Sequence, residues 1–170
     1  RRARAPSSVF NENDLAPDRE GALVRVTRAQ ESELPHELAL TFGDADNDYE
    51  VATVLSRRIE GWSQRRSENE TAVMTHRAAA QRIADIWLED AWRARETAEF
   101  RLAPQAAAIE PGDIVSLPGD SGARAWQITR ITEGAVRECF ARSVDPTIYD
   151  RAPPAYTRRK RSKPRAPGPP

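Results

Sequence analysis

Residues 75–113 read THRAAAQRIADIWLEDAWRARETAEFRLAPQAAAIEPGD, and they contain the strongest structural pattern in the chain. Apolar residues recur in this segment every three or four positions, which is the spacing of one helix face. These residues are Ala79, Ala80, Ile83, Trp87 and Ala91. Thr75 is a favourable N-cap residue, so we expect a helix from about 75 to 96 that begins at Thr75. Its Ala, Ile and Trp face is expected to be buried.

Alternating apolar and polar residues predict strands on both sides of this helix. Four candidates follow it, at 97–103, 113–117, 125–131 and 135–143, and a hairpin turn at Thr132, Glu133 and Gly134 joins the last two. Three precede it: 22–28, a strand marked by Leu38, Leu40 and Phe42, and 49–57, which also fits one helical turn followed by a strand. We therefore expect an α+β fold in which the helix packs on an antiparallel sheet or a small barrel. Ile83, Trp87, Phe100 and Trp126 are the expected core residues.

Residues 56–70 are highly charged, with two large apolar residues, Ile59 and Trp62, among them. We interpret this segment as an exposed excursion that Ile59 and Trp62 anchor to the body. A short extended piece, 70–74, then leads into the helix.

The chain has 170 residues, enough for one domain with tails or for two small domains. We expect a linker or covering loop over 1–19, one domain over 20–150, and a Pro/Arg-rich linker over 151–170 toward a following domain. The chain begins with Arg rather than Met, which favours a piece of a longer polypeptide. It has no apolar run of roughly 18 residues, so no transmembrane helix is expected.

The net charge of zero conceals an uneven distribution. Residues 1–4 hold three arginines and residues 157–170 hold six basic residues, and neither segment contains an acidic residue. The remaining body has 17 basic and 26 acidic residues, a net charge of −9. An acidic body with basic ends is therefore expected.

Residues 119–122 (GDSG) resemble the nucleophile loop of chymotrypsin-like serine proteases. That chemistry needs a histidine base beside Ser121 and an aspartate that orients the histidine. The only histidines are His36 and His76, neither lies in the Ala-Ala-His-Cys setting of that family, and Ala123 replaces the usual glycine. Gly, Asp and Ser are also the ordinary residues of a turn between two strands. We therefore expect a turn here, no catalytic residues, and a protein that is not an enzyme.

Asp44, Asp46 and Asp48 have the spacing of the first three ligands of an EF-hand loop. Tyr49 occupies the position that needs glycine, and Leu55 the position that needs a bidentate glutamate. We expect a solvated acidic turn, with a loose cation site as the alternative. No metal or cofactor is expected, because the other candidate ligands lack metal-ligand spacing: His36, His76 and Cys139. Cys139, the only cysteine, is expected to be a small core residue.

Residues 157–165 form a basic tail that supports two interpretations. The first is a soluble linker that proline and charge keep extended. The second is a nucleic-acid-binding module, in which the arginines and lysines contact phosphates. Only Tyr156 accompanies these charges as an aromatic residue, so base stacking has little support.

Several motifs in order resemble a known family. They are the turn LTFGDADNDY (40–49), the helix AAAQRIADIWL (78–88), the strand TAEFRL (97–102), the turn IEPGDIV (109–115), and the segments WQITRI (126–131) and VDPTIY (144–149). Together they resemble the tail-tip protein of gene transfer agents and related siphophage tail proteins, over roughly residues 20–150. Each motif alone is weak, and their order carries the resemblance.

The resemblance implies a trimeric baseplate hub domain at the distal end of the tail of a particle, assembled in the bacterial cytoplasm. Such proteins close or line the tail channel and hold fibres or receptor-binding parts, so we expect docking of neighbouring tail proteins and support of host attachment. The net charge of −9 adds the hypothesis that the body lines a channel through which DNA passes without specific binding. The relatives also carry a glycoside-hydrolase-like domain that is not recognisable in this sequence. Candidate contact residues are Trp62 and Trp92, together with exposed strand edges.

Overall fold

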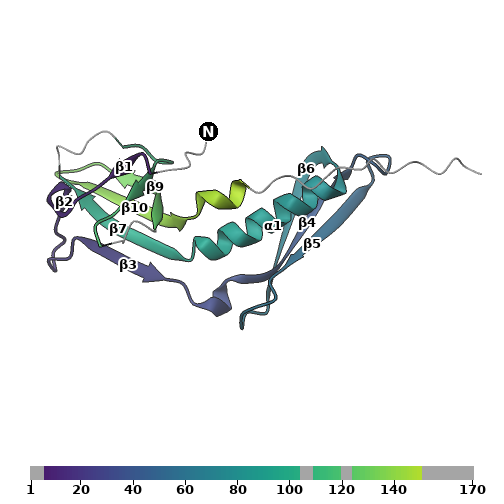
Figure 1. Ribbon diagram of the computed structural model, residues 1–170, viewed down its shortest axis with the longest axis horizontal. Helices are drawn as coiled ribbons and strands as arrows, with labels where there is room; N and C mark the ends of the chain where they lie inside the picture. The colour runs from purple at the N-terminus through teal and green to yellow at the C-terminus, as the bar shows by residue number, and fades with distance from the viewer. Residues whose placement is uncertain (1–5, 104–108, 120–123, 151–170) are drawn as a thin grey trace, which may run out of the picture.

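The computed structural model describes residues 6–103, 109–119 and 124–150. Within them the chain forms ten strands, three short 3-10 helices and one α-helix, α1 (Arg77–Arg93). The fold is α+β, and Figure 1 shows an elongated molecule with a sheet toward each end, in which α1 lies along the smaller sheet and one end of it points toward the larger sheet. No helix in these residues is long and apolar enough to cross a membrane.

Seven strands form the larger sheet. They are β1 (Ser8–Val9), β2 (Leu15–Ala16), β3 (Val24–Arg28), β7 (Glu96–Leu102), β8 (Ile114–Ser116), β9 (Ala125–Thr132) and β10 (Arg137–Val144). The order is β1-β8-β9-β10-β7, and β2 and β3 both pair with β7. The four strands predicted after the helix are confirmed, as is the hairpin between β9 and β10.

The larger sheet has a hydrophobic core of its own, formed by side chains of its strands and of the segments beside them. Trp126, which is fully buried, packs there with Phe100, Leu102 and Ile128. Cys139 is a small core residue in the same cluster, as expected. Residues 1–19 were expected to be a linker or a covering loop, and their described part contributes β1, β2 and the buried side chains of Phe10 and Leu15.

The smaller sheet has three strands in the order β5-β4-β6. They are β4 (Pro35–Asp44), β5 (Val51–Arg57) and β6 (Arg65–Thr75). Helix α1 covers the face from which Leu38, Leu40 and Phe42 project, and this forms a second hydrophobic core. Residues 51–57 are entirely a strand, so the alternative of a helical turn there is wrong.

Both sheets are mixed, which corrects the expectation of an antiparallel sheet. β1 runs parallel to β8, and β6 runs parallel to β4. The second pairing follows from the connection between β5 and β6, which crosses the N-terminal end of β4. The chain therefore enters the sheet on the far side of β4 and runs in the same direction as β4.

The segment 56–70 is also corrected. Residues from Arg65 onward belong to β6, so only the connection of residues 58–64, here called the β5–β6 loop, lies outside the sheet. Ile59 and Trp62 do not anchor it to the body, because their side chains are 98% and 92% exposed.

The buried face of α1 is shifted by about one residue from the predicted face. Thr75 ends β6, and the N-cap is His76, which makes no capping side-chain hydrogen bond. The buried residues recur every four positions: Ala80, Ala84, Leu88 and Trp92. Trp87 is 42% exposed, so its predicted place in the core is wrong. The small side chains of Ala80 and Ala84 pack in the core with the side chains of β4, and Trp92 at the end of the helix donates its indole N–H to the Pro35 carbonyl.

Asp90 of α1 joins the helix to the larger sheet. Its carboxylate accepts hydrogen bonds from Arg142 of β10, at 3.1 Å, and from the hydroxyl of Tyr149, at 3.0 Å. Tyr149 lies in the 3-10 helix η3 (Pro146–Tyr149). The backbone bond from the Ala29 amide to the Arg95 carbonyl, 2.8 Å long, adds a second link beside the 3-10 helix η2 (Glu31–Glu33).

We predict that Trp92→Ala destabilises the domain by about 3–5 kcal/mol, because it removes a buried indole and leaves a cavity. Trp87→Ala, the matched control on the same helix, should cost about 1 kcal/mol or less, because its ring already faces water. Urea denaturation of the two variants measures both values. Equal losses would contradict the assignment of the helix face.

Candidate functional site

The β5–β6 loop is held rigidly at its base. The Arg58 amide donates to the His36 carbonyl at 2.9 Å, and the Ser63 hydroxyl donates to the Leu34 carbonyl. The Arg58 guanidinium also stacks over the ring of Trp92, 4.2 Å from its centroid. These bonds fix both ends of a short connection against the start of β4.

Gly61 lies where this loop passes Trp92. Its φ is +123°, and a Cβ there would approach the Trp92 ring to 3.2 Å. Only glycine combines that backbone angle with that close approach at low cost. The constraint keeps the loop close to the helix while its tip projects outward.

The tip of the β5–β6 loop presents Ile59 and Trp62 to solvent. Residues 57–66 contain four arginines and one acidic residue. Arg57 and Arg66 both form ion pairs with Glu37 of β4, so part of this positive charge is neutralised within the molecule. Tryptophan and arginine are the residues most enriched at the energetic centres of protein interfaces. The loop therefore has the composition of a protein contact.

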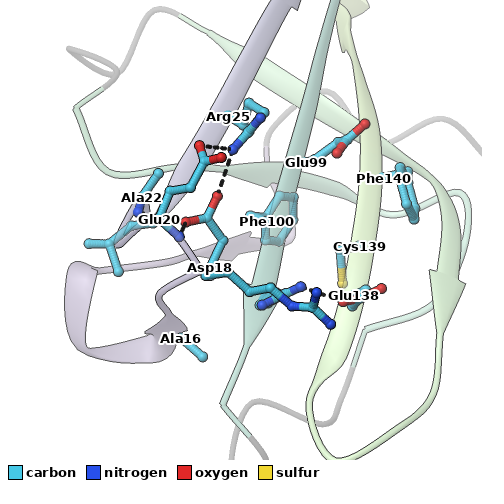
Figure 2. A pocket seen from close by; sticks show the side chains of 13 residues that line it. Ala16, Asp18, Glu20, Ala22, Arg25, Glu99, Phe100, Glu138, Cys139 and Phe140 are labelled. Atoms are coloured by element: carbon cyan, nitrogen blue, oxygen red, sulfur yellow. Dashed lines mark hydrogen bonds and ion pairs between the residues drawn. The ribbon is translucent and has the colours of Figure 1, made fainter.

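The second feature is a hollow of about 290 Å³ on the larger sheet, beside the loop of residues 17–23. β2 and β3 pair with consecutive positions of β7, Ala16 with Arg101 and Val24 with Phe100. The seven residues between the two strands are therefore forced out of the sheet and form one wall. Figure 2 shows the side chains around the hollow. Its polar and aromatic lining includes Asp18, Glu20, Arg25, Glu99, Glu138 and Phe140.

Asp18 organises this wall. One of its carboxylate oxygens accepts hydrogen bonds from the amides of Glu20 and Ala22, both at 2.8 Å, and the other accepts from Arg25 at 3.1 Å. Arg25 also reaches Glu20 at 2.7 Å, and Figure 2 shows the three side chains together. The Ala22 amide in particular, with the Glu20 amide and Arg25, holds the pKa of Asp18 below its usual value.

The rest of the lining comes from side chains opposite one another on β3, β7 and β10. Arg25 is paired with Glu99, Glu99 with Phe140, and Arg101 with Glu138. Arg101 and Glu138 form an ion pair of 2.8 Å. Neither Glu99 nor Arg19 makes an ion pair with another described residue, so the unpaired charges of the lining are one acidic and one basic group.

A wider cleft of about 800 Å³ lies between the C-terminal half of α1 and the segment that joins β10 to η3. Leu88 and Trp92 are among its lining residues. Its arginines are engaged within the molecule. Arg93 contacts Asp145 at 3.5 Å, and Arg124 contacts Glu96 at 3.5 Å. The walls of the cleft are therefore already joined by ion pairs. Its lining residues include no set of side chains arranged for catalysis or metal binding.

The residues that suggested chemistry are dispersed. Residues 120–123, with Ser121, and the basic tail 157–165 lie outside the described residues. His36 lies on β4, and His76 caps α1 with its Nδ1 3.2 Å from Asp46. Asp44 uses its carboxylate to accept the Asp46 amide at 3.0 Å, so it shapes the turn. Among the described residues, no three His, Cys, Asp or Glu side chains could hold a metal ion together.

The two tryptophans named as contact candidates differ. Trp62 is exposed, whereas Trp92 is 6% exposed and donates its indole N–H to the Pro35 carbonyl at 2.7 Å. Sequence reasoning missed the hollow altogether, because it depends on the pairing of β2 and β3 with one partner strand. The run RRIEGWSQRR, at 57–66, was the signal for the exposed loop.

The comparisons with known proteins agree with the resemblance seen in the sequence. A family model described as "Putative phage tail protein" matches residues 1–131. A chain of the solved structure "Virion of native gene transfer agent (GTA) particle" is 30% identical with a TM-score of 0.79, and the match covers 91% of this chain and 34% of that chain. None of the curated proteins compared matches this chain.

Two crystal structures of tail proteins are more distant, at 12% identity each. One is the 43 kDa tail protein of prophage MuSo2 from Shewanella oneidensis, with a TM-score of 0.46 and coverage of 88% of this chain and 46% of that chain. The other is a tail protein from Neisseria meningitidis MC58, with a TM-score of 0.44 and coverage of 81% and 44%. The chain spans about a third of the length of the gene transfer agent chain and less than half of the other two.

Burial of Cys139 raises the pKa of its thiol from 9.0 to about 11. A thiol whose pKa is higher in the folded state stabilises that state below the unfolded pKa, and this contribution is lost as the pH rises. We predict that the free energy of unfolding falls more steeply for the unmodified chain than for Cys139→Ala between about pH 9 and 11. Urea titrations of both proteins across that range measure it. If the free energies of unfolding of the two proteins changed with pH in parallel, burial would not raise the pKa of the Cys139 thiol.

Proposed function

This chain belongs to a family of phage tail proteins, and we propose that it is a structural component of the tail tip of a phage-like particle, acting as a baseplate hub domain. The observation that carries the proposal is the similarity to the gene transfer agent chain, at 30% identity and a TM-score of 0.79. Identity and fold similarity of this degree over 91% of the chain support a related place in a related particle.

The surface supports action by contact rather than by catalysis. The β5–β6 loop exposes two large apolar side chains, Ile59 and Trp62. β6 is an edge strand of eleven residues whose outer backbone groups are available for pairing with a strand of another chain. We propose that these features dock neighbouring tail proteins and further copies of the chain, with a trimer as the assembled state. We assign residues 20–150 to this hub domain, with β1 and β2 of the preceding segment completing its larger sheet, and 151–170 to the connection toward a following domain.

The charge of the body supports a second part of the proposal. Residues 5–156 carry a net charge of −9. In a ring, such a surface would repel the phosphates of DNA, so that DNA could pass during delivery to the host without adhering to the wall. The chain would act in the tail of the particle after assembly in the bacterial cytoplasm.

We predict that cells whose gene lacks residues 20–150 release particles without complete tail tips and without DNA delivery. Negative-stain images and a gene-transfer assay of the released particles measure both effects. The Trp87→Ala variant is the matched control, because its fold and its contact surfaces should be intact. Complete tails in the deletion strain would contradict a structural role.

The competing function, a nucleic-acid-binding module that uses residues 157–165, has a separate test. We predict that a chain without residues 157–170 binds DNA weakly, because the remaining body is acidic, and that the complete chain binds it only slightly better. A salt titration of DNA binding by both proteins measures this difference. Tight binding that is strongly salt-dependent and lost on truncation would favour the competing function.

A further inference from the structure

We propose that the smaller sheet continues from one copy of this chain to the next, with the free edge of β6 in one copy paired antiparallel with the free edge of β5 in a second copy. The inference rests on the proposed function, because it specifies the contact by which the tail component would self-associate. It follows from the strand order β5-β4-β6, in which each outer strand has one edge without a partner among the described residues (Figure 1).

β6 is the least covered strand of the smaller sheet. None of its eleven residues is buried, and the core beneath α1 contains side chains of β4 and β5 but none of β6. A long strand with a bare edge is a template for pairing, and natural proteins usually shorten or cover such an edge. The strands at the edges of the larger sheet are shorter, with two residues in β1 and five in β3. β6 is therefore the strand that gains most from a partner.

The two free edges of the smaller sheet are complementary in direction. β5 runs antiparallel to β4 and β6 runs parallel to it, so β5 and β6 run in opposite directions. When a rotated copy extends the sheet, its β5 meets β6 as an antiparallel neighbour, and antiparallel pairing is slightly more stable per residue than parallel pairing. Every copy carries both edges, so a second copy supplies the strand that each edge needs.

The hydrogen bonds of β4 determine which backbone groups are free at these edges. The Asp44 amide donates to the Glu50 carbonyl and the Arg58 amide to the His36 carbonyl, so the even-numbered residues of β4 bond to β5. The odd-numbered residues of β5 then point their amides and carbonyls away from β4. By the same alternation the odd-numbered residues of β4 face β6, and the even-numbered residues of β6 from Arg66 onward point outward.

The register follows from residues that share one level of the sheet. Val51 of β5 and Met74 of β6 both lie opposite Gly43 of β4, one on each side. A rotation about an axis along the strands keeps this level, so Val51 of one copy comes opposite Met74 of the next. The other pairs of this register join an odd-numbered residue of β5 to an even-numbered residue of β6, as the free backbone groups require. They are Thr53 with Ala72, Leu55 with Glu70 and Arg57 with Glu68.

The side chains along the two edges match in polarity. β5 reads VATVLSR and β6 reads RRSENETAVMT, so β5 begins with apolar residues and β6 ends with them. Because the paired strands run in opposite directions, these two apolar segments meet. Val51 is 78% exposed and Met74 is 59% exposed, so the pairing covers apolar side chains that face water in the single chain. Apolar pairs across neighbouring strands stabilise a sheet.

The surroundings of both edges leave room for this ladder. Strands lie roughly 4.8 Å apart, so the three strands repeat about every 14 Å. Packed helices need roughly 8–10 Å, so α1 of one copy would not collide with α1 of the next. The Leu55 carbonyl accepts a 2.9 Å bond from Gln81 of α1, and its second lone pair is left for the ladder. Arg57 and Glu68 already have ion-pair partners in their own chain, so charge contributes little to the contact.

The contact is heterologous, because each copy offers its β5 edge to one neighbour and its β6 edge to another. Such a contact closes into a ring when the rotation between copies brings the last copy back to the first.

Cysteine cross-linking tests the register. Val51→Cys and Met74→Cys are made in separate complete chains, in which the native Cys139 is buried. Opposite residues of a hydrogen-bonded antiparallel pair have Cα atoms about 5.5 Å apart, which is within the roughly 4.4–6.8 Å that a disulfide spans. A mixture of the two variants should form a disulfide-linked dimer under mild oxidation.

The control for the register is Leu55→Cys mixed with Met74→Cys. Leu55 is also exposed and lies on the same strand as Val51, but roughly 13 Å farther along it, so this mixture should not cross-link. Equal cross-linking of both mixtures would overturn the proposal. Cross-linking of Val51→Cys or Met74→Cys with itself would indicate a two-fold contact between like edges, and that result would overturn it as well.

Proline substitution tests the ladder itself. Thr53 points its amide away from β4, so Thr53→Pro removes a donor that β4 does not use, and proline is tolerated at such a position of an edge strand. Self-association of the complete chain, measured by sedimentation velocity over a range of concentrations, should weaken roughly tenfold or more, because the ring removes a ladder bond and obstructs the approach of β6. Circular dichroism checks that the variant is folded, and the cross-linking experiment decides the question if it is not.

Val26→Pro is the matched control at the free edge of β3. The Ala29 amide donates to the Arg95 carbonyl, so by alternation the amide of Val26 points away from β7. This variant should leave the dissociation constant within about twofold. Equal effects of the two proline substitutions would overturn the pairing of β5 with β6.

The outcomes separate this inference from the proposed function. If the unmodified chain self-associates but the cysteine pair does not cross-link and Thr53→Pro has no effect, this contact is wrong and the structural role stands. If the unmodified chain is monomeric at every concentration while the deletion of residues 20–150 still abolishes tail tips, both the contact and self-association are wrong. Complete tail tips in the deletion strain would remove the structural role itself.

Discussion

The indole of Trp92 joins three segments that are distant in sequence. Its N–H donates to the Pro35 carbonyl at the start of β4, its face carries the guanidinium of Arg58, and its edge limits Gly61. The ring is also the last member of the buried stripe of α1. The end of the helix, the start of the central strand and the β5–β6 loop therefore share one side chain. The parallel entry of β6 depends on that loop crossing the end of β4 at this point.

This arrangement explains how a polar, highly charged loop can display large apolar side chains. Backbone bonds to His36 and Leu34 satisfy polar groups at its base, and Arg58 stacks inward over the indole. The apolar side chains are left without an internal partner, so Ile59 and Trp62 face solvent. In a monomer such exposure is unfavourable, and it is relieved when another molecule covers the patch.

The larger sheet, unlike the smaller one, is not covered by α1 and has its core among its own strands. Its core is formed by the side chains of β7, β9 and β10 around Trp126, and the ladder of β7 is shared by β2 and β3. The residues between β2 and β3 must leave the sheet, and Asp18 converts this excursion into an ordered wall. Asp90 then ties α1 to the larger sheet through Arg142 and Tyr149. The two sheets, each with its own core, are therefore held together through one helix.

The sequence by itself determined the α+β class, the position of α1, the strands β7 to β10 and the family, because these features rest on periodicity within short segments and on the order of motifs. It did not determine which face of α1 is buried. A helix with Ala79, Ala80, Ile83, Ala84, Trp87 and Leu88 offers two overlapping apolar faces, and the closest approach to β4 selected the one with Ala80 and Ala84. Only the tertiary structure decided the parallel pairing of β6, the outward direction of Trp62 and the hollow beside residues 17–23. Each of these depends on which strand lies next to which, and local sequence does not encode the choice of neighbour.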